Sequence, residues 1–351
     1  MVASGFTLAL EPKAAHDEMG AAYDLGYGRM GGLLGLELRV VNSLNQALVL
    51  YPFLSPPVDM MKNSVTPLMT MGDGTQLWKF THNGVDTHPI HVHLFNVQVI
   101  NRVGWDGALL PPDPSELGWK ETVLMNPLEH LIVALRPVLP PMPFQVPNSV
   151  RLIDPTQPAG VLLRGGPTGF QDPLGIRVTV FNHMVNFGHE YVMHCHILSH
   201  EEMDMMHAMA FVTQPAAPGK PTLTVKQRDV TVTWNDVLNA SHYALERATN
   251  LAGPWTVIAA NVPVPVIRGT TVSYLDAKLK PGTYYYRVTS INTVGDTTVY
   301  ANSLGFPTLT LGSVASVATI QGTSIPTNPG TSDPSDGVQV LDWFFGAFIV
   351  N

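Results

Sequence analysis

The sequence predicts an all-β protein with two successive β-sandwich domains. Short β-rich runs are separated by Pro/Gly-rich loops up to about residue 213, and a Pro/Ala/Gly segment follows at residues 214–221. A second series of alternating strands comes after this segment, with turn signals at the spacing of a small sandwich. At 351 residues, the chain is long enough for two hydrophobic cores.

The composition excludes several classes of function. A content of 45% hydrophobic and 13% charged residues is typical of a folded protein rather than a disordered one. The net charge of -8, with no run of Lys or Arg, argues against a nucleic-acid partner because phosphates require clustered cations. No stretch approaches the roughly 20 apolar residues of a membrane span. The N-terminus lacks the basic region of a secretory signal, so we expect no signal peptide on this chain.

Residues 1–34 are expected to form a leader or connecting segment rather than a core element. They show few periodic signals and carry most of the glycine-rich run GYGRMGGLLG. Residues 35–214 form the first predicted domain. Its β-rich runs include QLWKF at 76–80, VQVIN at 97–101 and VTVFN at 178–182.

Residues 215–221 are predicted to be a linker because of their Pro, Ala and Gly content. In the second predicted domain, residues 222–312, apolar side chains share a face on each of three strands: Val230, Val232 and Trp234; Tyr243 and Leu245; Tyr284, Tyr286 and Val288. Residues 313–351 are expected to be a Ser/Thr/Pro-rich linker and an apolar tail. That tail is either a docking strand or a frayed terminus.

Two segments of this second domain, VTVTW at 230–234 and LKPGTYYYRVTSIN at 279–292, resemble a fibronectin type III module. The resemblance implies a small immunoglobulin-like sandwich in which Tyr284 is the corner tyrosine. It also implies a spacer or adhesion role rather than chemistry for this part of the chain.

Two histidine-rich clusters in the first domain carry the chemistry. They are THPIHVHLF at 87–95 and HCHILSHEEMDMM at 194–206. Because side chains alternate between the faces of a strand, His91 and His93 point one way and His88 points the other. We therefore expect the first cluster to serve two different sites.

The second cluster contains Cys195, the single cysteine of the chain, so no intrachain disulfide can form. On a strand, His194 and His196 share one face and Cys195 takes the opposite face. His200 and Met205 follow the strand and could fold back to meet the thiolate. Two histidines, a cysteine thiolate and a weak thioether are the ligands of a blue copper site. Zinc also accepts His/Cys sets, but the flanking histidine pairs and the methionine favour copper.

HPIHVH and HCHILSHEEMDMM resemble the third and fourth copper motifs of the multicopper oxidases. This resemblance implies that the first domain is a C-terminal cupredoxin domain, a Greek-key β-sandwich. It implies type 1 copper ligands at His88, Cys195, His200 and Met205, a type 2 ligand at His91, and type 3 ligands at His93, His194 and His196. Asp204 stands where the family commonly has glycine, which leaves the loop geometry open.

The resemblance also implies a laccase-like, copper-dependent oxidoreductase. Single electrons from a small reducing substrate, a phenol or a metal ion, enter at the type 1 copper and pass through Cys195 to a trinuclear copper site that reduces O2 to water. Glu201 is expected to relay protons or hydrogen-bond a ligand, with an exposed loop carboxylate as the alternative.

The family's trinuclear site uses eight histidines, and this chain offers four. A complementary N-terminal cupredoxin domain or subunit is therefore expected to complete it, without which the chain is expected to be inactive. The family implies an extracellular or periplasmic location, as for a secreted enzyme. Two alternatives stay open: a stand-alone type 1 blue copper electron-transfer protein, and an adhesion protein with a structural copper.

Other candidates receive simpler interpretations. Met60, Met61, Met69 and Met71 form either a soft copper-binding patch or ordinary packing, and packing is favoured. The remaining histidines are taken as ordinary residues: His16, His82, His130, His183, His189, His207 and His242.

Overall fold

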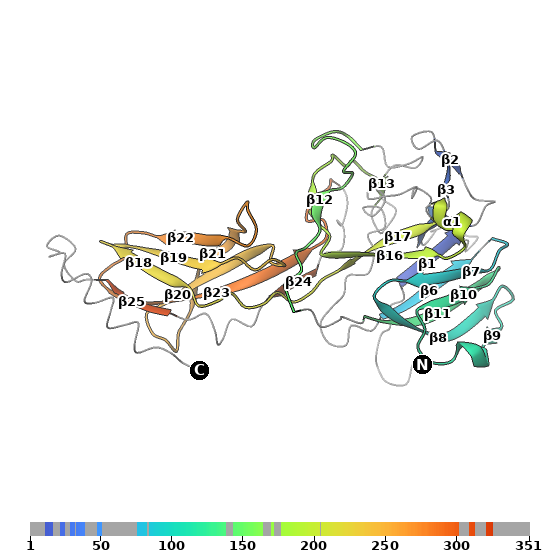
Figure 1. Ribbon diagram of the computed structural model, residues 1–351, viewed down its shortest axis with the longest axis horizontal. Coiled ribbons are helices and arrows are strands. Elements are labelled where there is room, and N and C mark those ends of the chain that lie inside the picture. Colours follow the sequence, from blue (N-terminus) through green and yellow to red (C-terminus); the bar gives the residue numbers. More distant parts are fainter. Residues whose placement is uncertain are drawn as a thin grey trace. The chain divides into compact units, whose positions relative to one another are not determined.

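A computed structural model of the chain describes residues 11–16, 22–24, 29–31, 33–38, 48–50, 76–82, 84–137, 143–163, 170–171, 177–203, 205–301, 309–312 and 321–325. The regular secondary structure of the described residues is almost entirely β-strand, which confirms the predicted all-β class (Figure 1). Within these ranges, no helix is long and apolar enough to cross a membrane.

The chain divides into two compact units. Unit 1 comprises Met1–Pro141, Ser149–Val212 and Val294–Leu309, and unit 2 comprises Met142–Asn148, Thr213–Thr293 and Thr310–Asn351. The predicted methionine patch, Asp204 and most of the predicted tail at 313–351 lie outside the described residues.

Unit 1 contains two main sheets. The first has the strand order β5 (Leu48–Leu50), β4 (Leu33–Leu38), β1 (Glu11–His16), β6 (Gln76–His82), β11 (Glu129–Pro137), β8 (Phe95–Gly104) and β9 (Leu109–Leu110). The second has the order β10 (Thr122–Met125), β7 (His88–Val92), β16 (His189–Cys195) and β17 (Met206–Phe211). A separate hairpin pairs β2 (Ala22–Asp24) with β3 (Arg29–Gly31).

The N-terminal strands differ from the expected leader. β1 pairs in parallel with β6, with Lys13 opposite Phe80, and in antiparallel fashion with β4. Leu34 at the end of the expected leader is fully buried. β1 belongs to the sheet because β4 and β6 pair with it, although its own sequence has little periodic pattern.

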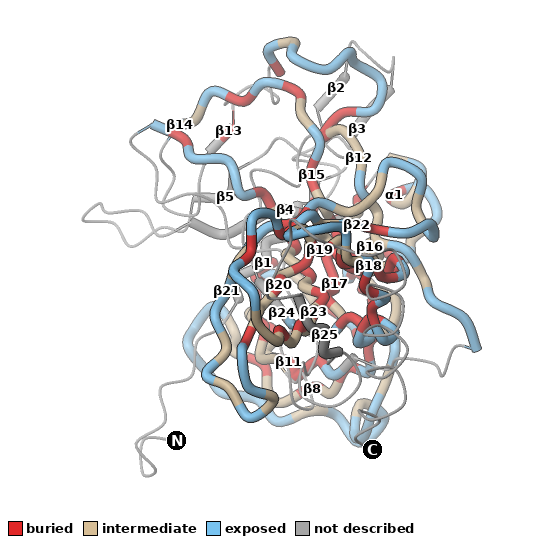
Figure 2. The backbone as a smooth tube through the Cα atoms, turned by 90° about the vertical axis from the view of Figure 1, so that its left-hand side faces the viewer, coloured by how far each residue is buried: buried red, intermediate tan, exposed pale blue. Residues whose placement is uncertain are grey.

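The core of unit 1 lies between the two sheets. Trp78 of β6 contacts Phe95 of β8, and Phe95 meets Phe211 of β17 edge to face at 6.4 Å between ring centroids. Ile90 of β7 is fully buried. Buried and partly buried residues alternate along β7, and Figure 2 shows in red where the buried residues lie along the chain.

A two-residue turn carries the chain from β7 in the second sheet to β8 in the first. Leu94 in this turn has φ of 69°, a left-handed conformation that is uncommon for residues other than glycine. His93, just before it, still donates its backbone N–H to Val192 of β16 at 3.0 Å. The turn therefore keeps His93 registered against β16 before the chain leaves the sheet.

The part of the chain that follows β11 and precedes β16 forms a smaller lobe. It contains β12 (Val150–Leu152) paired with β15 (Met184–Asn186), and β13 (Phe170–Gln171) paired with β14 (Arg177–Val178). The predicted strand at 178–182 is continuous only to Val178, and beyond it Phe181 forms an isolated antiparallel bridge with Leu162. The N–H of Leu163 donates to the carbonyl of Val180, and the buried Asn182 amide donates to the carbonyl oxygens of Asp154 and Gln157.

Unit 2 also contains two sheets. One has the order β18 (Thr222–Lys226), β19 (Asp229–Asn235) and β22 (Thr271–Asp276). The other has β21 (Thr256–Pro263), β20 (His242–Ala248), β23 (Gly282–Val294) and β24 (Leu309–Gly312), and β25 (Gln321–Ile325) also pairs with β23.

The inward residues of unit 2 confirm the predicted alternation. Val230, Val232 and Trp234 of β19 are buried and the residues between them are partly exposed. Tyr243 of β20 packs edge to face on Trp234 with 5.4 Å between centroids. The Tyr284 hydroxyl donates to the carbonyl of Lys280, four residues upstream, at 2.9 Å.

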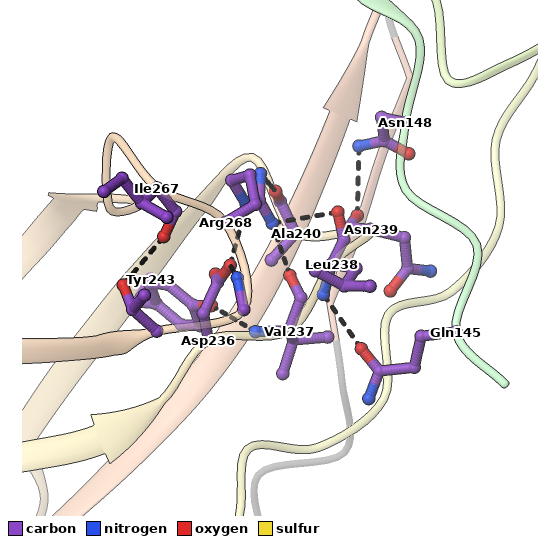
Figure 3. Close-up of polar contacts among 12 residues, drawn as sticks. Gln145, Asn148, Asp236, Val237, Leu238, Asn239, Ala240, Tyr243, Ile267 and Arg268 are labelled. Atoms are coloured by element: carbon purple, nitrogen blue, oxygen red, sulfur yellow. Dashed lines mark hydrogen bonds and ion pairs between the residues drawn. The ribbon is translucent and has the colours of Figure 1, made fainter.

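A buried carboxylate organises the loop after β19 (Figure 3). Asp236 accepts hydrogen bonds from the Tyr243 hydroxyl at 2.6 Å, from Arg268 Nε at 2.7 Å and from the Gly269 N–H at 2.8 Å. Arg268 also donates to the carbonyl of Val237 at 2.6 Å. This polar network fixes the loop together with Val237, whose side chain is buried in the core of unit 2.

The segment at residues 143–148 is bonded to the same loop (Figure 3). Leu238 donates its N–H to the Gln145 side chain at 2.9 Å, and the Asn148 amide donates to the carbonyl of Asn239 at 3.1 Å. These bonds explain why the segment clusters with unit 2 although residues on both sides of it belong to unit 1.

Candidate metal centre

The register of the second sheet brings the two histidine clusters side by side. β7 and β16 run antiparallel, with His91 opposite His194 and Ile90 opposite Cys195. Directly opposed residues of an antiparallel pair point to the same face. His91 and His194 therefore share one face, and Cys195 lies on the other face with Ile90.

The first group of donor atoms lies on the Cys195 face. Cys195 Sγ is 3.2 Å from His88 Nδ1 and 3.7 Å from His200 Nδ1, and the two histidine nitrogens are 3.3 Å apart. The three side chains are 0%, 0% and 1% exposed, so the site excludes bulk water. His200 is presented by α1 (Leu198–Glu202), the short helix that follows β16.

These distances can be tested against the needs of one metal ion. Nitrogen and sulfur ligands bound at about 2.0–2.3 Å, at trigonal to tetrahedral angles, lie roughly 3.3–3.8 Å apart. The three distances observed agree within a few tenths of an ångström. A thiolate with two imidazoles is also the donor set that copper in an electron-transfer site prefers.

Met205 is placed to join this group. It is fully buried, and its carbonyl accepts the N–H of Cys195 at 2.9 Å while its own N–H donates to the carbonyl of His200 at 2.9 Å. Met206 is registered opposite His194. By alternation, Met205 shares the face of Cys195 and Met206 shares the face of His194.

The environment of Cys195 keeps its thiol protonated in the metal-free chain. Burial raises the pKa of Cys195 to about 11, although the N–H of Ile197, 3.5 Å from the sulfur, favours the thiolate. A metal ion reverses this preference, since a coordinated thiol is deprotonated.

The second group of donor atoms lies on the opposite face. It consists of four histidines whose rings approach one another with centroids 4.9 to 5.7 Å apart: His91, His93, His194 and His196. Within this group, His93 Nε2 and His194 Nε2 lie 3.2 Å apart. Burial lowers the pKa of His93, and the neighbouring imidazoles of His91 and His194 lower it further. The neutral ring that results is the form that binds metals.

Hydrogen bonds orient two of these rings. His91 Nδ1 lies 3.0 Å from the carbonyl of Glu121 and 3.0 Å from Thr122 Oγ1, and His194 Nδ1 lies 3.1 Å from the carbonyl of Cys195. A carbonyl oxygen only accepts, so each Nδ1 carries the proton. Each Nε2 is then free to bind a metal ion.

Glu201 lies behind the second group. Its Oε2 is 3.7 Å from Nδ1 of both His194 and His196. That oxygen is buried and accepts no hydrogen bond from the described residues, although the side chain as a whole is 37% exposed. The carboxylate is therefore turned toward the histidines rather than directed only to solvent.

A cavity of about 300 Å³ opens beside His91 and His93. Asn96, Glu121 and Tyr191 also line it. The second group thus borders an accessible space, whereas the first group is enclosed.

Three contributing residues were missed from the sequence. Glu121 and Thr122 orient His91 through strand pairing, and nothing in their residue types signals that role. His82 packs against His88 with ring centroids 4.6 Å apart. Its position six residues before His88, in the same histidine-rich stretch, was a signal available in the sequence.

Comparison with known proteins gives two sequence relatives. A laccase of Bacillus subtilis (strain 168) is 27% identical over 154 residues, covering 40% of this chain and 21% of that protein. A laccase of Haloferax volcanii is 42% identical over 65 residues, covering 18% of this chain and 11% of that protein. These two matches support a multicopper oxidase family. The chain spans about a fifth or less of the length of these curated relatives.

Solved structures include a multicopper oxidase, McoA of Aquifex aeolicus. It is 21% identical with a TM-score of 0.25 and covers 42% of this chain and 21% of that one. An Fn3-like protein of Clostridium thermocellum is 24% identical with a TM-score of 0.22, covering 31% of this chain and 92% of that one. No protein-family model matches the chain. For a multicopper oxidase the metal is copper, which suits the donor set of the first group.

Proposed function

We propose that this chain is one half of a copper-dependent, laccase-like oxidase. In this proposal the chain oxidises a small reducing substrate, a phenol or a metal ion, one electron at a time, and O2 is reduced to water. The observation that carries the proposal is the position of Cys195, whose sulfur joins His88 and His200 while its two chain neighbours belong to the second group.

Each donor group has its own task. His88, Cys195, His200 and Met205 would hold a type 1 copper, His91 a type 2 copper, and His93, His194 and His196 type 3 coppers. When bound, copper supplies the one-electron redox change. The chain then provides a direct covalent path, because the backbone of Cys195 continues on either side into His194 and His196.

Burial of the first group decides how substrate is oxidised. His88 and Cys195 are fully enclosed and His200 is almost so. A substrate in solvent therefore exchanges electrons through the protein rather than by binding directly to the metal. Enclosure also excludes water from the site.

Glu201 is proposed to manage protons. Reduction of one O2 to two waters consumes four electrons and four protons. The Glu201 carboxylate lies 3.7 Å from two histidines of the second group. It can hold a proton near the place where oxygen is reduced, and it can fix the orientation of those rings.

The second group is half of a trinuclear site, so a complement is required. His196 is 50% exposed, and His91 and His93 border the cavity beside the sheet. Open donors of this kind support completion by an N-terminal cupredoxin domain or a separate subunit. Unit 1 would then be the C-terminal cupredoxin domain, within predicted bounds of residues 35–214.

Unit 2 is proposed to be a fibronectin type III module that acts as a spacer. Two packed sheets and the Tyr284 bond to the carbonyl of Lys280 support this assignment. The family relationship supports an extracellular or periplasmic location for such a modular oxidase.

Copper stoichiometry combined with visible absorption tests the proposal. The purified chain loaded with Cu(II) should bind about one copper in the first group and show an intense thiolate-to-copper band. O2 consumption should appear only after a complementary domain is added. A colourless protein that prefers zinc would contradict the proposal.

A second candidate is a stand-alone blue copper electron carrier. The observation that favours it is that the first group is complete and enclosed within this chain, whereas the second group is open. A carrier would show the thiolate band and reversible reduction but no O2 consumption with any complement.

A further inference from the structure

We propose that His82 is a positioning residue for His88 and fixes that ring before copper binds; the inference rests on the proposed type 1 site. His82 ends β6 and is fully buried. Its ring faces that of His88 with centroids 4.6 Å apart and planes tilted by 47°. No other role was expected for it from the sequence.

Hydrogen bonds define the state of His82. The N–H of Gly84 donates to His82 Nδ1 at 2.9 Å, so Nδ1 carries a lone pair. His82 Nε2 is bonded to the carbonyl of Asp86, which only accepts, so Nε2 carries the proton. Both nitrogens are therefore committed to the backbone, and His82 is not itself a metal ligand.

These two bonds span the turn that leads into β7. The turn contains Gly84 and Asp86 and ends two residues before His88. By binding an N–H and a carbonyl of the same turn, the His82 ring fixes the path of the backbone that delivers His88. One imidazole can hold both ends of the turn because its Nδ1 accepts a hydrogen bond and its Nε2 donates one.

Two histidine rings lie against the buried His88 ring. The centroid of the His82 ring is 4.6 Å from that of His88, and the centroid of the His200 ring is 5.1 Å from it. A ring enclosed in this way loses little further freedom when it binds a metal, which strengthens binding and defines the ligand geometry. His82 therefore acts on copper through His88 without touching the metal.

Two substitutions of His82 separate its contributions. His82→Phe keeps an aromatic ring against His88 but removes both hydrogen bonds. His82→Asn keeps an acceptor at the position of Nδ1 for the Gly84 N–H and removes the ring. His183→Asn, a histidine of unit 1 bonded to Asp296 and Thr298, is the matched control.

Three readouts are compared on the full-length chain: affinity for Cu(II), the position and intensity of the thiolate band, and the rate at which a thiol reagent modifies metal-free Cys195. The chain has a single cysteine, so the last signal comes from that site alone. We expect His82→Phe to weaken Cu(II) binding roughly tenfold, to shift the band and to speed modification. His82→Asn should recover part of the loss, because it restores the bond to Gly84 but not the ring, and His183→Asn should match the native chain.

Unchanged affinity, band and reactivity in His82→Phe overturn the inference, even if its thermal stability falls. An Asn variant no better than the Phe variant also overturns it, because the turn bond would then have no effect. Failure of the proposed function gives a different result, in which the native chain itself shows no thiolate band with Cu(II).

Discussion

Cys195 Sγ and His88 Nδ1 lie 3.2 Å apart although 107 residues separate them in the chain. The pairing of β7 with β16 produces this contact, with Cys195 opposite Ile90 and His88 two residues away on the same face. The same pairing sends His91 and His194 to the other face. One strand register therefore builds two donor groups joined through a single cysteine, and the following predictions depend on it.

Cys195→Ser should abolish the thiolate-to-copper band and the copper bound in the first group. The hydroxyl is close in size to the thiol, so the fold should persist, but serine offers no thiolate ligand. Copper content and visible absorption check the result. Loss of the band could also result from unfolding. Circular dichroism of the same sample is therefore the control, because it shows whether the substituted chain is still folded. Persistence of the band in Cys195→Ser, which contains no cysteine, would show that the band does not arise from a Cys195 thiolate.

Met205→Leu should keep the copper but change both the thiolate-to-copper band and the reduction potential of the site. Leucine fills a similar volume and costs less than about 1.5 kcal/mol of stability. Met206→Leu is the matched control, because Met206 is registered with His194 on the other face. Equal effects of the two substitutions on the potential would exclude Met205 as the axial ligand.

Glu201→Gln should leave the thiolate band intact and slow O2 reduction by the completed enzyme about 10²- to 10⁴-fold. Glutamine keeps the shape but cannot hold and release a proton beside His194 and His196. Rates measured across pH check this expectation. Glu202→Gln, on the exposed side of α1, is the control. Loss of the band in Glu201→Gln would show that the residue supports the metal instead.

Acid should destabilise unit 1 partly through Glu116. Burial alone would raise the pKa of Glu116, but its hydrogen bonds to Arg102 and to the Asp113 N–H hold that pKa below its usual value. A depressed folded pKa gives stability that is present above the unfolded value, near 4.3, and is lost as pH falls through the folded value.

Glu116→Gln should therefore unfold more easily than the native chain at pH 7, and the difference should shrink below about pH 4. Urea unfolding at a series of pH values measures it. A constant difference between the two proteins at every pH would show that the ionised carboxylate of Glu116 contributes nothing to stability.

Asp236→Ala should cost unit 2 about 3–5 kcal/mol, because it leaves the Tyr243 hydroxyl and the Arg268 guanidinium without their shared acceptor. Glu246→Ala removes the partner of Arg287 in a less buried pair and should cost about 1 kcal/mol or less. Chemical denaturation measures both. Similar costs for the two variants would contradict a special role for the buried carboxylate.

Most of the candidate site could be predicted from the sequence because side chains alternate between the two faces of a strand. Residues spaced by two along a strand share a face, so the partition of His91 and His93 from His88 could be predicted without coordinates. The buried faces of the strands in unit 2 could be predicted for the same reason, since Val230, Val232 and Trp234 occur at every second residue of β19.

Contacts set by tertiary pairing could not be predicted in this way. β1 joins the first sheet through a parallel partner more than 60 residues away, and its own sequence lacks periodicity. The segment after Val178 has strand-like residues, but its pairing is reduced to an isolated bridge between Phe181 and Leu162, and the Asn182 amide binds a loop. His82 was overlooked because its effect passes through the backbone of a turn.

Anomalous diffraction at the copper edge tests the central claim most directly. Crystals of the full-length chain grown with Cu(II) should show a strong peak within bonding distance of His88 Nδ1, Cys195 Sγ and His200 Nδ1. The peak should disappear from this position in Cys195→Ser crystals prepared in the same way. A native map with no peak among these three atoms, or with copper only at surface histidines, would contradict the account.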